Sequence, residues 1–288
     1  MRVFLFSLFV ISSLPSLSQE NEIDSLIQII NTCLPLDGDS CQTVIQELIK
    51  SVENSSNQRL YAHILIYAGE AYSDIGDFDK GERLLIKAKT ISESIGATAL
   101  DANSTDLLGI IALGQGNYQE AISYFVGSAK KWEETGNKAE LAKVYSHSAT
   151  VFFNINELKK AQHYESLIKD IAEELDDDQL RVDVLANTAL YSMTYGINYY
   201  LKNEQDTSNL QTTLDTLDFY FNKSEVEYYE GLDFARKIGS QIDELSLLNN
   251  LVVLTLNMEN NEKALEIAKK SEILLENDLL TISFENLP

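Results

Sequence analysis

The chain has 288 residues, of which 44% are hydrophobic and only three are proline, so it has the composition of a folded and largely helical protein. Its 45 acidic and 22 basic side chains give a formal net charge of −23, which repels phosphate backbones and anionic membranes. This balance argues against nucleic acid as a partner. It indicates solvated outer helix faces, with attraction for a basic partner as the alternative.

The first residues have the pattern of a secretory signal. Met1 and Arg2 precede an apolar stretch from Val3 to Leu14, and Pro15 to Ser18 form a small-residue end. We expect a signal peptide over residues 1–18, cleavage after Ser18, and a secreted or periplasmic protein. The alternative is a membrane anchor, but about twelve apolar residues are too few to span a bilayer comfortably. No stable membrane insertion is expected after cleavage.

A turn motif returns every 40 residues along the middle of the chain. It reads Gly76-Asp77-Phe78, then Gly116-Asn117-Tyr118, then Asn156-Glu157-Leu158. A fixed period of this length is typical of a solenoid, in which each unit buries its apolar face against its neighbours. Function is then expected in a groove or along an edge.

Each turn is flanked by two small residues. Counted from the start of a unit, they occupy places eight and twenty, as in the pairs Gly69 and Gly81, Gly109 and Ala121, and Ala149 and Ala161. Small side chains allow the two antiparallel helices of one unit to approach closely. The glycine at place fifteen ends the first helix, because a left-handed conformation costs a residue without a Cβ almost nothing.

A small residue at place eight, glycine at fifteen, an aromatic residue at seventeen and alanine at twenty resemble the tetratricopeptide repeat. The usual unit of that family has 34 residues, whereas the longer unit of this chain is similar to the exported sensory repeat arrays of bacterial signalling proteins. The resemblance implies an all-α, right-handed superhelical solenoid of antiparallel helix pairs. A HEAT-like helical array is the alternative, and the repeated Gly-x-aromatic-x-x-Ala pattern argues against it.

The repeat phase divides the chain after the signal peptide into six segments, one of which carries an insertion. They are a divergent helix pair at 19–61, repeats at 62–101, 102–141 and 142–181, a repeat at 182–244 with an extended hairpin at about 197–219, and a last repeat at 245–288.

The extended hairpin accounts for the largest break in the pattern. Between the turn position Gly196 and the expected second helix at Ser224, the chain is 23 residues longer than the other units require. Ile197 to Lys202 can prolong the first helix, and Asn203 to Asn209 form a polar turn. Most of the many aromatic residues are expected to pack between the two long helices, and an exposed remainder would form a dimer or partner surface.

The two cysteines are predicted to form a disulfide. Cys33 falls at place twelve of the first helix in its unit and Cys41 at place twenty, so they face each other across a turn, and export favours oxidation. The alternative is a pair of buried small hydrophobic residues. Metal binding is not expected, because two thiols without two further ligands do not complete a tetrahedral site.

The sequence offers little for catalysis. Its histidines, His63, His147 and His163, share no ligand spacing, and Asp176 to Asp178 lack the alternating oxygen ligands of a calcium loop, so this acidic run is interpreted as a solvated turn. No phosphate-binding glycine loop or serine elbow occurs. We expect no catalytic, cofactor-binding or metal-binding residues.

The resemblance to tetratricopeptide repeats also implies where a ligand binds, because in that family the first helices line the concave face. The residues at the corresponding places are polar in most units, and asparagine recurs; an amide that both donates and accepts suits an extended peptide, although amides that only satisfy neighbouring helices are the alternative. The predicted binding residues are Tyr67, Glu70, Asn103, Asp106, Lys143, His147, Asp183, Asn187, Asn249, Asn250 and Asn257.

Together these features predict a non-catalytic scaffold that binds a protein or peptide, within a bacterial signalling system. A cell-surface or periplasmic assembly adaptor is the main alternative, and an accessory subunit of an enzyme is a remote one. Ile282 and Phe284 make the last segment apolar, so its end is expected to be covered by a further repeat, a partner or a second copy. Self-association is thus expected at this end or through the hairpin.

Overall fold

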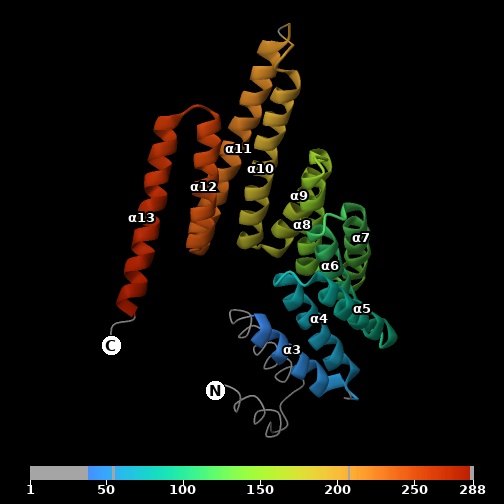
Figure 1. Cartoon of the computed structure of the whole chain (residues 1–288). Coiled ribbons are helices and arrows are strands. Elements are labelled where there is room, and N and C mark those ends of the chain that lie inside the picture. Colours follow the sequence, from blue (N-terminus) through green and yellow to red (C-terminus); the bar gives the residue numbers. More distant parts are fainter. Residues whose placement is uncertain (1–37, 54–55, 207, 286–288) are drawn as a thin grey trace. The chain divides into compact units, whose positions relative to one another are not determined.

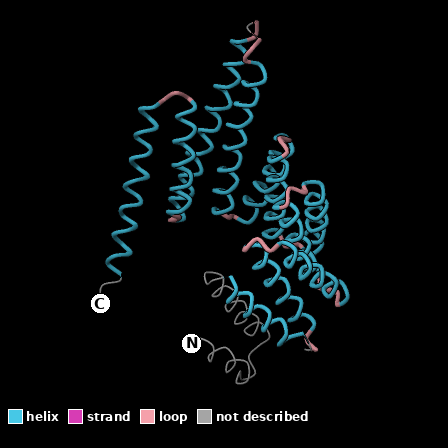
Figure 2. Tube along the Cα trace, viewed as in Figure 1, coloured by secondary structure: helices cyan, strands magenta, loops and turns pink. Residues whose placement is uncertain are grey.

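The structure is a computed structural model that describes residues 38–53, 56–206 and 208–285. Within these ranges the regular secondary structure is helical, without a strand (Figure 2). The expected signal peptide and Cys33 lie outside the described residues, as do the side chains of Cys41 and of the apolar C-terminal end, so those expectations stay predictions. The chain forms two compact units, Met1–Val144 and Tyr145–Pro288, and each is described by itself.

The first unit is a stack of consecutive helices. From α3 to α7, each helix packs against the next one in the chain, and α4 also contacts α6, so the first helices of these two pairs are neighbours (Figure 1). The unit contains α3 (Gly38–Glu53), α4 (Gln58–Asp74), α5 (Phe78–Ser94), α6 (Thr98–Gly114), α7 (Tyr118–Thr135) and the first residues of α8 (Lys138–Asn154).

The second unit is built around a long helical hairpin. Its two longest helices, α10 and α11, share the most extensive packing in the unit, and α10 also contacts α9 and α12 (Figure 1). The unit comprises the remainder of α8, α9 (Leu158–Leu175), α10 (Asp178–Asn203), α11 (Leu210–Ile238), α12 (Gln241–Asn257) and α13 (Asn261–Glu285). The predicted hairpin and its polar turn are therefore confirmed, and with them the all-α fold of helix pairs.

Left-handed residues end most of the described helices. Gly76 and Gly116 have φ values of 81° and 77°, which confirms that they end their helices as predicted. Asn156 occupies the corresponding position with φ 60°, and Glu259 does so with φ 57°. A non-glycine residue in this region crowds its own Cβ, and asparagine tolerates it better than glutamate does.

Gly196 departs from this rule. It stands at the place of the turn, but it lies inside α10, and the helix continues to Asn203. A Cβ at Gly196 would lie 3.0 Å from the Cβ of Tyr220 on α11. In this repeat the glycine therefore serves the close approach of two long helices, and the turn is displaced to the tip of the hairpin.

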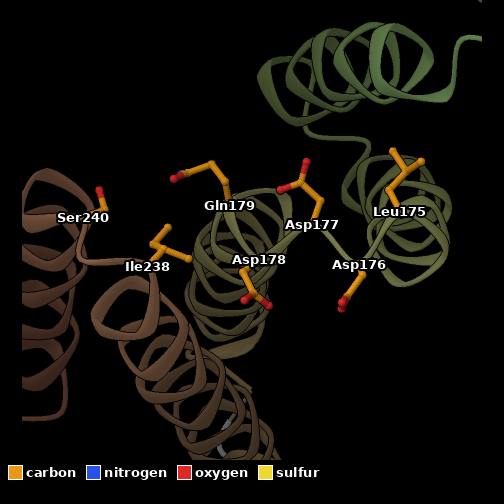
Figure 3. Close-up of a pocket in the computed structure, with 7 residues that line it drawn as sticks. All are labelled: Leu175, Asp176, Asp177, Asp178, Gln179, Ile238 and Ser240. Atoms are coloured by element: carbon orange, nitrogen blue, oxygen red, sulfur yellow. The ribbon is translucent and has the colours of Figure 1, made fainter.

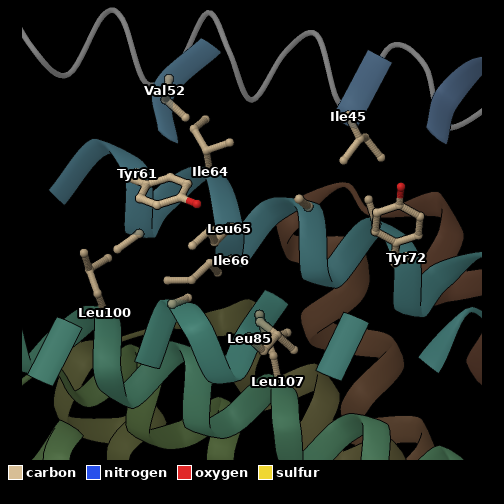
Figure 4. Close-up of a cluster of buried hydrophobic side chains, with 14 of the residues drawn as sticks. Ile45, Val52, Tyr61, Ile64, Leu65, Ile66, Tyr72, Leu85, Leu100 and Leu107 are labelled. Atoms are coloured by element: carbon tan, nitrogen blue, oxygen red, sulfur yellow. The ribbon is translucent and has the colours of Figure 1, made fainter. Parts of the chain in front are cut away.

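The core of the first unit shows why small residues recur at places eight and twenty. A Cβ at Gly81 would lie 2.8 Å from the carbonyl oxygen of Gly69, so α4 and α5 touch backbone to backbone. Large side chains fill the space on either side of this contact, and Leu65, Tyr72 and Leu85 are among the most deeply buried (Figure 4). Burial of one such side chain contributes about 1.5–3 kcal/mol.

Candidate functional site

In the first unit, predicted binding residues from three successive first helices lie near one another. Partial loss of solvent raises the pKa of Glu70 on α4, and the negative charges of Asp74 and Asp106 raise it further, whereas the positive charge of Lys143 opposes this effect. Asp106 belongs to α6 and Lys143 to α8. The structure therefore brings Glu70, Asp106 and Lys143 into one electrostatic group.

The other predicted residues of this unit are less exposed. Tyr67 and Asn103 are half-buried, and Asp106 is buried at 8% exposure. His63, also half-buried, has its pKa lowered by burial and by the positive charge of Arg59, which favours a neutral imidazole. The polar face of the first helices thus combines exposed carboxylate and ammonium groups with partly buried rings and amides.

In the second unit, the first helices α10 and α12 are joined by one side chain. The Gln179 amide donates to Asp183 on its own helix at 3.2 Å and to Asp243 on α12 at 2.9 Å. Asp183 is a predicted binding residue, and its pKa is raised by burial and by the charges of Asp243 and Asp177, against the lowering effect of Gln179. The result is an acidic patch on α10 and α12.

The predicted asparagines of this unit have different environments. Asn187 on α10 and Asn250 on α12 are half-buried, whereas Asn249 and Asn257 are exposed. Asn257 donates at 2.8 Å to the carbonyl oxygen of Val253 on its own helix, so part of its hydrogen-bonding capacity is used locally. His147 is half-buried on α8. The structure does not gather these side chains into one group.

Glu165 is the polar residue that the sequence analysis missed. Its side chain on α9 is fully buried, and neither carboxylate oxygen has a hydrogen bond of good geometry among the described residues. Burial raises its pKa to about 8, and the nearby Asn187 and Tyr191 of α10 oppose this shift only in part. A sequence signal did exist: Glu165 interrupts the apolar stripe of α9 between Ala161 and Ile168.

Aromatic rings surround the same junction. The ring of Tyr191 stacks on Phe153 of α8 with centroids 4.8 Å apart, and burial raises its pKa. Phe152 of α8 stacks on Tyr164 of α9 at 5.6 Å. These ring contacts join α8 to both α9 and α10.

An open pocket of about 600 Å³ lies at one end of the second unit (Figure 3). Its lining residues come from the two turns that join α9 to α10 and α11 to α12 and from the helix ends beside these turns: Leu175, Asp176, Asp177, Asp178, Gln179, Ile238 and Ser240.

Several polar groups of this pocket serve the helices themselves. Asp177 accepts from the Leu180 backbone at the start of α10, and Ser240 caps α12. Asp178 pairs with Arg181 at 2.5 Å and with Lys237 at 2.6 Å, which lowers the pKa of Asp178. Across the described ranges, His, Cys, Asp and Glu form no group of three or more that could hold a metal ion.

In the part of the chain that the structure describes, every helix is too short or too polar to cross a membrane. No curated protein sequence matches the chain significantly. Residues 60–126 match the family model described as tetratricopeptide repeat.

Solved structures resemble most of the chain at low sequence identity. BtubC (BKLC) from P. vanneervenii is 14% identical with a TM-score of 0.58, over 95% of this chain and 94% of that one. Aspartyl phosphate phosphatase F from Bacillus subtilis is 12% identical with a TM-score of 0.56, over 88% of this chain and 60% of that one.

A third similar structure is a Rap protein complexed with competence and sporulation factor. It is 14% identical with a TM-score of 0.50, over 85% of this chain and 66% of that one. The similarity to these solved structures establishes the fold. The match to the family model identifies which residues have the sequence pattern of the repeat. Residues 60–126 are therefore tetratricopeptide repeats, and the chain has the fold of tetratricopeptide repeat proteins.

Proposed function

We propose that the chain is a non-catalytic scaffold that binds a peptide or protein through the polar face of its first helices. The observation that supports this is the electrostatic group of Glu70, Asp106 and Lys143, because three consecutive first helices, α4, α6 and α8, each contribute a charged side chain to it. Tetratricopeptide repeats generally act as binding frames rather than enzymes, and a Rap protein of similar fold has been solved in complex with competence and sporulation factor.

The test is selection of peptides from a random display library on the purified chain, followed by affinity measurement of the enriched peptides by fluorescence anisotropy. Glu70→Gln removes a charge from the proposed surface. Glu134→Gln is the matched control, because Glu134 is exposed on the second helix α7. Weaker binding by Glu70→Gln alone supports the surface, whereas equal losses in both variants, or no enriched peptide, contradict it.

We further propose that the chain is exported and serves as the interaction part of a bacterial signalling system. The N-terminal pattern of residues 1–18 supports export. Fusion of residues 1–60 to alkaline phosphatase, which is active only after export, tests it, with deletion of Val3 to Leu14 as the control. An assembly adaptor at the cell surface remains the second candidate. An accessory subunit of an enzyme is a distant third.

A further inference from the structure

The outer face of α11 carries an exposed stripe near the tip of the hairpin. The opposite face of the helix packs on α10, through residues such as Tyr220 and Ser224. Because an α-helix has 3.6 residues in each turn, the side chains of the stripe share one side of α11, turned away from α10. All of them are exposed, and we name them the hairpin stripe: Thr212, Asp215, Phe219, Asn222, Lys223 and Val226.

Two members of the hairpin stripe are large and apolar. Phe219 is 62% exposed and Val226 is 56% exposed, and they lie about two helical turns apart. Phe219 contacts Tyr220 edge to face with the ring centroids 5.2 Å apart, yet most of its own ring remains in water. A single exposed apolar side chain is ordinary, so the residues around Phe219 decide whether it belongs to a contact surface.

Opposite charges stand on either side of Phe219. Asp215 lies four residues before it, accepts a hydrogen bond of 2.8 Å from the neutral Gln211, and forms no ion pair within the described ranges. Lys223 lies four residues after it, and its ion pair with Glu227 on the same helix is long, at 3.7 Å. The carboxylate and the ammonium group can therefore each take a further partner of opposite charge.

This arrangement is complementary to itself in one orientation. When a second α11 lies antiparallel with its Phe219 opposite the first, each residue four places before the ring faces the residue four places after it. Asp215 then faces Lys223 of the second copy, and the same pair forms again on the other side of the rings. Thr212 and Val226, each seven places from the ring, face each other in the same way. A contact that uses the same surface on both copies has two-fold symmetry.

The charge of the whole chain makes such local pairing important. A net charge of −23 repels one copy from another, so two copies associate only where the surface carries both signs in matching positions. A parallel arrangement of two α11 helices would place Asp215 against Asp215 and add to the repulsion. The antiparallel arrangement replaces two repulsions by two attractions and covers the exposed rings.

We propose that the hairpin stripe binds the hairpin stripe of a second copy of this chain, with the two α11 helices antiparallel and the Phe219 rings at the two-fold axis. The inference is independent of the proposed peptide surface, which lies on the first helices. From Thr212 to Val226 the contact extends over about 21 Å of helix, which is small for an interface between proteins. We therefore expect a reversible dimer with a dissociation constant in the micromolar range.

The experiment exchanges the charges and measures association by sedimentation equilibrium of the purified chain over roughly 1–100 μM. Asp215→Lys places two lysines opposite each other, and Lys223→Asp places two aspartates opposite each other. Each variant should raise the dissociation constant of the dimer by about tenfold or more, because like charges face each other across the contact. Glu173→Lys, an exposed site on α9 with the same change of charge as Asp215→Lys, is the matched control and should dimerise as the unaltered chain does.

An equimolar mixture of Asp215→Lys and Lys223→Asp tests the orientation itself. In a mixed dimer, two lysines of one variant face two aspartates of the other, so dimerisation should recover to about the level of the unaltered chain. Recovery also shows that both variants are folded. Dimers of the unaltered chain, weakened in each variant and restored in the mixture, support the inference.

Three results would overturn the inference. The first is an unaltered chain that stays monomeric over the whole range of concentration. The second is a dimer that neither charge variant weakens, or that Glu173→Lys weakens equally, since the contact would then lie elsewhere or depend on charge in general. The third is loss of the dimer in both variants without recovery in the mixture, because the antiparallel pairing requires recovery.

Discussion

The hydroxyl of Ser224 on α11 donates a hydrogen bond of 2.8 Å to the backbone carbonyl oxygen of Ala189 on α10. The corresponding place in the first unit is the contact of Gly81 with Gly69, where a Cβ on Gly81 would lie 2.8 Å from the Gly69 carbonyl oxygen. Small residues at both places allow helix backbones to meet. The long hairpin extends beyond this contact without disturbing it.

Gly81→Ala is expected to destabilise the chain by about 1–3 kcal/mol, because its Cβ meets a backbone atom that cannot move aside. Gly127→Ala is the matched change inside α7, where the nearest atom to a new Cβ is 3.7 Å away. That change should stabilise the chain by up to about 1 kcal/mol through helix propensity. Urea denaturation measures the free energy of unfolding of both variants. A change of the same sign in the two variants would contradict the close contact at Gly81.

Glu259→Gly is expected to stabilise the chain by a few tenths to about 1 kcal/mol. Glu259 has φ 57°, a conformation that crowds the Cβ of any residue other than glycine. The gain is reduced by the greater freedom of glycine in the unfolded chain. Thermal unfolding is the measurement. Glu259→Ala keeps the Cβ and serves as the control, so an equal rise in Tm for both variants would point to a cause other than backbone strain.

Because of Glu165, the free energy of unfolding of the chain should decrease as the pH rises. Its folded pKa of about 8 lies above the unfolded value near 4.5, so the folded state holds more protons in this interval and loses stability as pH rises through it. Between pH 5 and pH 8 the loss is about 3.5 kcal/mol. Chemical denaturation at pH 5 and pH 8 measures this loss, and Glu165→Gln should abolish it. If the unaltered chain and the variant lose the same unfolding free energy between the two pH values, the prediction is wrong.

The exposed ring of Phe219 tests self-association through the hairpin. Phe219 is 62% exposed on α11, while most of the other hairpin aromatics are buried or half-buried. Light scattering is expected to show a dimer that Phe219→Ser disrupts, because the ring supplies apolar area to the contact. Ile242→Ser removes an 81% exposed side chain outside the hairpin and should leave the mass unchanged. If light scattering shows that the unaltered chain is a monomer, the prediction is wrong.

The proposed export predicts how the chain is processed. Mass spectrometry should find a mature N-terminus at Gln19. Cys33 and Cys41 should resist alkylation until a reductant is added, because an oxidising compartment favours their disulfide. Their substitution together by serine should leave no alkylation under any condition. A retained Met1 would contradict cleavage of the signal peptide. Alkylation without a reductant would contradict the disulfide.

Sequence alone determined the features that depend on neighbouring residues. The turns at Gly76 and Gly116, the small residues Gly69 and Gly81, and the polar tip of the hairpin all follow from local conformational cost and from helix periodicity. These preferences depend only on residues a few positions apart, so they can be recognised at the same place in successive repeats.

Only the tertiary structure decided the features that depend on partners distant in sequence. Gly196 became a helix contact because Tyr220 lies against it, and Asp106 and Lys143 became neighbours of Glu70 because successive first helices stack. Glu165 appears in the sequence as one more acid of an acidic chain. Its burial against α10, without a basic partner among the described residues, gives it a raised pKa, since the cost of a charge depends on what surrounds it.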